Sequence, residues 1–337
     1  MSSESPSSSA AAKPAVEVMK LRLAAQYASP RERHLLDQLA DQVEVNHDFD
    51  EAVRSMSWRS APALKPMLEQ AIAAGAPGDI VLRILQHDSK IASPSRQLLS
   101  VLTYPALLLT ASILLVKVLQ VTSINRESFI WFEEFQLKGY ENFSKLLADF
   151  DNFVNGVFIT LIWSAIMIVT IRLAASPLTR LRVLIRLPLI GHNIRLLALS
   201  RLVNRISVFL LHSPDAQTAL ERTAAAFESE ALGDVASYVA DRNEQGAYLG
   251  YTIHQTLLSD QRAGLVLAAA DVPEGSLSER LRQAASTFAV MSELLESRLR
   301  VFLPVIMLVL LVGIVGNAVS VYFTAISALM RLITSLS

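Results

Sequence analysis

The residues that most often perform chemistry in proteins are present in this chain, but they are not spaced for it. Six histidines are scattered along the sequence: His34, His47, His87, His192, His212 and His254. No two of them fall at the spacing of a metal-ligand pair, and no His-Glu-x-x-His sequence occurs. The chain has no cysteine, which excludes disulfides, thiolate metal sites and cysteine nucleophiles. The sequence therefore predicts no metal centre and no thiol enzyme.

The nearest approach to a catalytic set is His212-Ser213-Pro214-Asp215. Residues this close together at a helix start point in different directions, so we do not expect a triad. We interpret Ser213 as the N-cap of a helix, with Pro214 at its first position and Asp215 in its first turn. No glycine is followed by lysine, so the chain lacks the phosphate-binding loop of nucleotide-hydrolysing proteins. We predict a non-enzymatic protein without a cofactor, for which any ATP chemistry would need a separate ATPase.

The composition indicates which elements must carry the apolar residues. Of the 337 residues 52% are apolar and 18% are charged, and the net charge of -1 argues against a nucleic-acid binder. The apolar residues concentrate in three runs without charge, at 98–116, 153–171 and 301–330. Each run reaches the length of roughly 20 residues that a membrane-crossing helix needs. We therefore predict an all-α polytopic membrane protein with transmembrane helices at 98–117, 153–172 and 301–323.

The basic residues beside the runs predict the orientation. Arginines follow the second run without any acidic residue before Asp215, whereas the loop 118–152 is mainly acidic, so the arginine-rich side is cytoplasmic. This gives a disordered tail at 1–16, cytoplasmic helical bundles at 17–97 and 173–300, a periplasmic loop at 118–152 and a periplasmic tail at 324–337. Most of the arginines are expected to contact lipid headgroups. Arg201 and Arg205, four apart on one helix face, are candidates for binding an acidic partner.

Residues inside the predicted spans indicate packing rather than transport. An ionisable residue inside a span would indicate an ion or substrate path. The three uncharged runs contain none. Pro105 and Pro304 lie near the cytoplasmic ends and can redirect the helices toward the bundles. Gly313, Gly316 and Ser320 are small residues suited to close helix packing.

Three pairs of segments repeat in the same order along the chain. Residues 46–53 match 246–253 at an offset of 200, 73–84 match 269–281 at 196 to 197, and 104–108 match 303–307 at 199. The repeated unit is a helical bundle, a glycine turn, a long amphipathic helix and a span with proline near its entry.

This order of elements resembles the F-type inner-membrane platform proteins of type II secretion and type IV pilus systems, the GspF/PilC family, over about residues 17–330. The resemblance rests on these segments: Arg201-Leu-Val-Asn-Arg205-Ile-Ser-Val-Phe-Leu-Leu211, Ala219-Leu220-Glu221, Leu187-Pro188-Leu-Ile190-Gly191, Gly246-x-x-Leu249 and Gly275-x-Leu277. It implies a multi-pass protein of the bacterial inner membrane, with a cytoplasmic N-terminus and a periplasmic C-terminus. The implied partners are a secretion or pilus assembly ATPase, pilin-like subunits, other inner-membrane assembly proteins, membrane lipid and further copies of the chain.

Two other functions agree less well with the sequence than this platform role does. An oligomeric transporter or channel subunit usually carries its repeat and its broken helices within the membrane, whereas here the recognisable repeat is mostly cytoplasmic. A membrane-tethered enzyme is disfavoured because no catalytic motif is present.

Overall fold

The computed structural model describes residues 7–46, 48–91, 176–186, 191–228, 230–244, 248–272 and 276–336, and scattered positions between 107 and 166. Every regular element in these parts is a helix, which confirms the all-α prediction. The chain divides into two compact units, one made of residues 1–95 and 175–296 and the other of 96–174 and 297–337. The first, which we call the bundle unit, thus contains nearly all of both segments predicted as cytoplasmic bundles.

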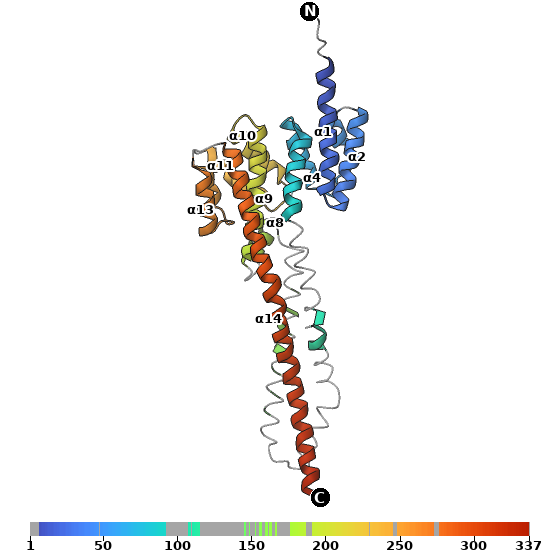
Figure 1. Cartoon of the computed structure of the whole chain (residues 1–337), viewed down its shortest axis with the longest axis vertical. Helices are drawn as coiled ribbons and strands as arrows, with labels where there is room; N and C mark the ends of the chain where they lie inside the picture. Colours follow the sequence, from blue (N-terminus) through green and yellow to red (C-terminus); the bar gives the residue numbers. More distant parts are fainter. Residues whose placement is uncertain are drawn as a thin grey trace, which may run out of the picture. The chain divides into compact units, whose positions relative to one another are not determined.

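The first segment of the bundle unit begins with α1 (Ser7–Tyr27) and α2 (Pro30–Asn46), which lie side by side (Figure 1). Glu32, in the first turn of α2, accepts the Ser29 N–H at 2.9 Å, which is one of the two hydrogen bonds of a capping box. Two shorter helices and one unlabelled helix complete the segment: α3 (Phe49–Ser55), α4 (Leu64–Ala73) and residues 77–91. Residues 7–16, predicted as part of a disordered tail, are helical and continuous with the rest of α1; Ala10, Ala11 and Ala12 favour a helix, although Pro14 does not.

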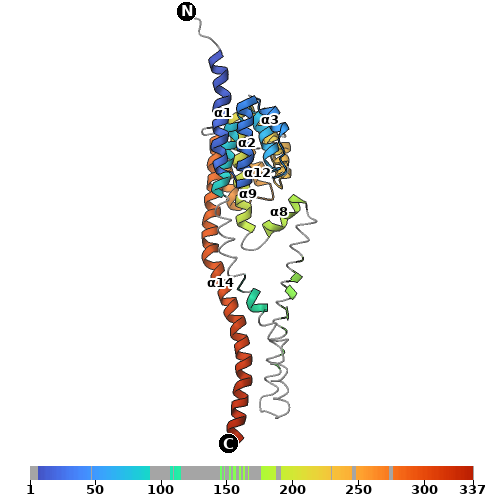
Figure 2. The same cartoon turned by 90° about the vertical axis from the view of Figure 1, so that its right-hand side faces the viewer.

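The second segment contains α8 (Pro177–Arg186), α9 (Gly191–His212), α10 (Ala216–Ala226), α11 (Gly233–Glu244), α12 (Leu249–His254) and α13 (Gln261–Ala270). It also includes the first part of α14 (Leu277–Leu336), which is a single helix through Pro304 (Figure 2). Aspartates cap α10 and α13: Asp215 accepts the Thr218 N–H and Asp260 accepts the Ala263 N–H. These side chains satisfy N–H groups that a helix start leaves unpaired.

Helix α9 contributes to both hydrophobic cores of the bundle unit. Phe209, which is fully buried, packs in the core formed mainly by the first segment, together with Leu36 and Leu68. Leu199 and Leu202, also fully buried, belong instead to the core of the second segment. A helix with apolar residues on more than one face must be buried on more than one side. Helix α9 therefore joins the two segments.

The sequence repeat corresponds to a repeated order of helices. The short helix α3 begins at Phe49 and α12 begins at Leu249, which preserves the offset of 200. Helices α4 and α13 follow them, and next come the longer helix 77–91 in the first segment and α14 in the second. The matching stretches of sequence thus encode matching helix boundaries.

The predicted spans are described only in part. Most of 98–117 and 153–172, including Pro105, lies outside the described residues, whereas 301–323 lies within α14, which continues to Leu336. Among the described residues, no helix combines the length and the apolar character needed to cross a membrane. A Cβ built on Gly313 or Gly316 meets no described atom within 4 Å, so the described part of the chain supplies no close packing partner for them. The side chain of Ser320 is outside the description.

Candidate functional site

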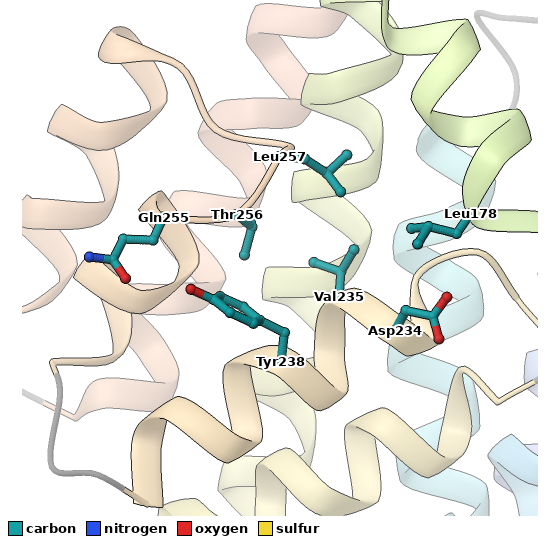
Figure 3. Close-up of a pocket in the computed structure, with 7 residues that line it drawn as sticks. All are labelled: Leu178, Asp234, Val235, Tyr238, Gln255, Thr256 and Leu257. Carbon is teal, nitrogen blue, oxygen red and sulfur yellow. The ribbon is translucent and has the colours of Figure 1, made fainter.

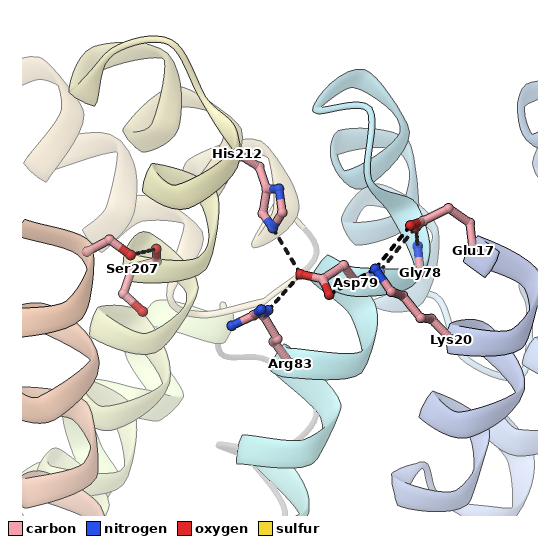
Figure 4. Close-up of polar contacts among 8 residues, drawn as sticks. Glu17, Lys20, Gly78, Asp79, Arg83, Ser207 and His212 are labelled. Carbon is pink, nitrogen blue, oxygen red and sulfur yellow. Dashed lines mark hydrogen bonds and ion pairs between the residues drawn. The ribbon is translucent and has the colours of Figure 1, made fainter. Parts of the chain in front are cut away.

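A network of charged side chains centred on Asp79 connects the two segments of the bundle unit (Figure 4). The Asp79 carboxylate accepts a hydrogen bond from Arg83 Nε at 2.6 Å and pairs with Lys20 Nζ at 3.1 Å. From α9, His212 Nε2 lies 3.1 Å from the same carboxylate. One half-buried acid thus holds groups from α1, helix 77–91 and α9 together.

The pKa shifts in this network favour the charged forms. Burial alone would raise the pKa of Asp79, but the hydrogen bonds from Arg83 and Lys20 outweigh it and hold the pKa below the ordinary 3.8. Burial alone would lower the pKa of Lys20, but its bonds to Asp79 and Glu17 outweigh this and raise the pKa. The contacts of Asp79 with Lys20, Arg83 and His212 therefore join three helices.

Glu17 of α1 caps helix 77–91 across the first segment. Its carboxylate accepts the Gly78 N–H at 2.7 Å and the Asp79 N–H at 3.3 Å. The approach is so close that a Cβ on Gly78 would lie 2.4 Å from the Glu17 carbonyl oxygen. Only glycine fits there without displacing the backbone, and this contact positions Asp79 for its partners.

A second ionic cluster surrounds Arg205 on α9. The guanidinium donates to Glu230 at 3.0 Å, lies 3.7 Å from Asp88 of helix 77–91 and stacks 3.9 Å from the centre of the Phe227 ring. Its side chain is only 7% exposed. Arg201, one turn earlier, also lies 3.7 Å from Asp88, but its side chain is 38% exposed. The two arginines share an acid that comes from the other segment.

The two arginines predicted to bind a partner therefore differ in how far they are exposed. Both arginines lie on α9 and turn toward the same acid, as the spacing of four residues suggests. Arg205 is buried and engaged within the chain, so it is not an accessible docking residue here. Of the two side chains, that of Arg201 is the more exposed.

A buried polar chain ties three helices together near this cluster. Ser200 of α9 donates its hydroxyl hydrogen to the Ala285 carbonyl of α14 at 2.7 Å, so its oxygen must accept from His87 Nε2 at 2.9 Å. Burial lowers the pKa of His87 and favours the neutral ring. Neutral His87 therefore carries its proton on Nε2 and acts as a donor.

The residues of the apparent catalytic set take separate partners. His212 pairs with Asp79, Ser213 accepts from Arg222 Nη1 at 3.0 Å, and Asp215 accepts the Thr218 N–H at 2.6 Å. The expectation that they form no triad agrees with this geometry. The predicted N-cap is corrected: α10 begins at Ala216 with Asp215 as its cap, and Ser213 lies outside the helix.

Cavities lie among the described residues of the bundle unit, and two of them have polar side chains in their lining. The first, of about 350 Å³, lies between α8, α11 and the end of α12 (Figure 3). Tyr238 and Gln255 bring polar groups to a lining that also contains Leu178, Val235 and Leu257, and Asp234 is its one carboxylate. A single acid with no base beside it gives no catalytic pair. The second cavity is polar and is lined by helix 77–91, α9 and the start of α14.

The acids that form these contacts were not predicted as site residues from the sequence. Asp79 was recognisable only as a residue near a helix start, and nothing in the sequence distinguished Asp88 or Glu17 from solvated acids. Asp88 lies 113 positions before Arg201, and a spacing of that size predicts no contact. Among the described residues, no three His, Asp or Glu side chains gather closely enough to hold a metal ion.

Comparison with known proteins gives no relative from which a function can be transferred. No protein-family model matches the chain, and no curated protein matches its sequence.

Proposed function

We propose that the protein is a non-enzymatic inner-membrane platform of a type II secretion or type IV pilus-like system. In this role the bundle unit faces the cytoplasm and engages an assembly ATPase, while spans at 98–117, 153–172 and 301–323 anchor the chain and receive pilin-like subunits. The ATP chemistry takes place in the partner. Several copies of the chain are expected to act together beneath a ring-shaped motor.

One observation carries the proposal: the short helix, second helix and long helix occur in the same order in both segments of the bundle unit. In the second segment the long helix is α14, which extends without a break into the uncharged stretch 301–330. The ionic contacts of Asp79 and Asp88 join the two segments, so they support a bundle unit that moves as one body. A platform that transmits motion from a motor needs such a body.

The proposal is tested by deleting the gene and measuring filament assembly or secretion, with the abundance of the assembly ATPase as a control. We expect export to be lost while the ATPase level is unchanged. Normal export in the deletion strain would refute the proposal. Substrate flux through proteoliposomes that contain this chain alone would favour a transporter instead.

A second experiment tests the contact with the ATPase. A photocrosslinking residue at position 201 is expected to capture the ATPase in cells, because this position on α9 is partly exposed. The same residue at the exposed position 262 of α13 is the matched control. Equal capture from both positions would contradict docking at Arg201.

A further inference from the structure

Hydrogen bonds join α9 and α14 at regular intervals, and we call them the polar ladder. Each bond lies seven residues from the next on both helices, which run antiparallel. The pairs are Ser278 Oγ with the Ser207 carbonyl at 2.7 Å, Ser200 Oγ with the Ala285 carbonyl at 2.7 Å, and Ser292 Oγ with Asn193 Oδ1. The second and third bonds are buried, so water cannot easily replace them.

The apolar residues of both helices repeat at the same interval of seven. On α14, Leu281 and Phe288 are buried in the core of the second segment, and Leu295 packs against it. On α9, Leu196 and Val203 are buried in the same core. In helices with such a repeat, a slip by seven residues places apolar side chains opposite apolar side chains again. Apolar packing alone therefore distinguishes only weakly between registers that differ by one repeat, which is a shift of about 10.5 Å.

The bonds of the polar ladder differ in how strongly they select the register. Ser200 donates to a backbone carbonyl, which every residue of α14 supplies, so this bond can also form after a slip. Ser292 and Asn193 bond through their side chains, so these two residues must face each other. A slip by seven would place Leu299 or Ala285 opposite Asn193, and neither side chain can donate a hydrogen bond. The Asn193–Ser292 pair therefore opposes a slip in either direction.

The burial of this pair gives the selection its strength. Asn193 is 6% exposed and Ser292 is 2% exposed. A buried polar group that loses its partner does not regain a hydrogen bond from water, so such groups are rare in folded proteins. The cost corresponds to a bias of roughly 5- to 150-fold between two registers with equal apolar contact. A single buried asparagine fixes the register of a coiled coil in the same way.

We propose that the Asn193–Ser292 pair is a register lock, which holds α14 in one of several possible heptad registers against α9. Because α14 continues as one helix through residues 301–330, a slip would move that whole stretch along the helix axis. The lock thus fixes the point at which the uncharged stretch begins after the contact with α9. The proposal does not depend on the platform function.

The test is cysteine crosslinking of the full-length chain in a non-ionic detergent, because the chain has no cysteine of its own. The pair Ser207→Cys with Ser278→Cys reports the observed register. The pair Ser207→Cys with Ala285→Cys reports a slip in one direction, and Ser200→Cys with Ser278→Cys reports a slip in the other. A disulfide needs Cα atoms within about 7 Å, so it separates registers that lie about 10.5 Å apart.

Each cysteine pair is placed in three backgrounds. The first is otherwise wild type, and the second lacks the lock through the double substitution Asn193→Leu with Ser292→Ala. The third, the matched control, carries Gln283→Ala at an exposed position of α14. The melting temperature of each variant is measured alongside the crosslinks.

We expect the slipped crosslinks to stay at background in the wild-type and control backgrounds, and at least one of them to increase about fivefold or more without the lock. The lock-free variant should keep its melting temperature, because replacing both partners of a buried hydrogen bond by apolar groups is nearly neutral. Slipped crosslinks that stay at background without the lock would overturn the proposal. Loss of the observed-register crosslink without gain of a slipped one would also overturn it, because the pair would then support the fold and not the register.

Discussion

Replacing Arg205 by alanine should destabilise the bundle unit strongly, because the guanidinium is nearly buried between two acids. The substitution removes the ion pair with Glu230, the contact with Asp88 and the stacking on Phe227. Removing one partner of a buried ion pair costs about 3–5 kcal/mol. Here Asp88 and Glu230 are 19% and 24% exposed, so water partly solvates the acids left behind. We therefore expect the lower limit, about 3 kcal/mol.

The assay is thermal unfolding of the full-length chain in detergent, followed by tryptophan fluorescence. Trp58 reports on the first core, where it is 7% exposed and donates to the Val53 carbonyl at 2.8 Å. For a cooperative unit of about 200 residues, 1 kcal/mol shifts the melting temperature by about 2–4 °C, so Arg205→Ala should lower it by about 6–12 °C. Arg201→Ala, which removes only a partly exposed pair, should lower it by less than about 3 °C.

Two outcomes would refute this reasoning. Equal shifts in melting temperature for Arg205→Ala and Arg201→Ala would mean that the burial of Arg205 does not contribute to stability. The double variant Arg205→Met with Glu230→Leu should recover much of the loss, because an apolar pair of similar size can replace a buried ion pair. If the double variant is less stable than Arg205→Ala, the loss in Arg205→Ala does not come from an unpaired Glu230, and the reasoning is refuted.

Further predictions concern the Asp79 network and the glycine at position 313. Since the folded pKa of Asp79 is lowered, its charge stabilises the fold above the ordinary pKa of 3.8, and this contribution is lost as the pH falls through the folded value. Asp79→Asn should therefore lower the melting temperature at pH 7, with the gap to wild type closing in strong acid; a gap that widened on acidification would contradict the sign. Gly78→Ala should cost about 2 kcal/mol through the clash with the Glu17 carbonyl, measured by the same melting assay. Gly313→Ala, whose new Cβ meets no described atom within 4 Å, should raise the melting temperature by about 1–4 °C, because glycine inside a helix costs about 0.5–1 kcal/mol relative to alanine.

The helical class and the repeat were predictable because they depend on local patterns. Apolar residues at helical spacing, as in Leu35, Leu36 and Leu39, place those side chains in a core whatever the helix packs against. The segments 46–53 and 246–253, matched at an offset of 200, contain the starts of α3 and α12, and these starts keep the same offset. The cap of α10 was misplaced by two residues, since Ser213 and Asp215 are both good caps and the sequence alone does not choose between them.

The charged contacts were not predictable, because each depends on how one segment packs against the other. Arg201 and Arg205 stood out as surface charges on a helix face, but that face turns toward helix 77–91, which supplies Asp88. Helix α9 explains the difference. Its apolar residues pack in two cores, so little of its surface contacts solvent. Arg201 and Arg205 therefore lie at the interface between the two segments. In a repeat of two segments, the helix that joins them is the one whose charges are hardest to interpret from sequence. Arg201, the less buried of the pair, is therefore the residue at which packing and docking can be separated by experiment.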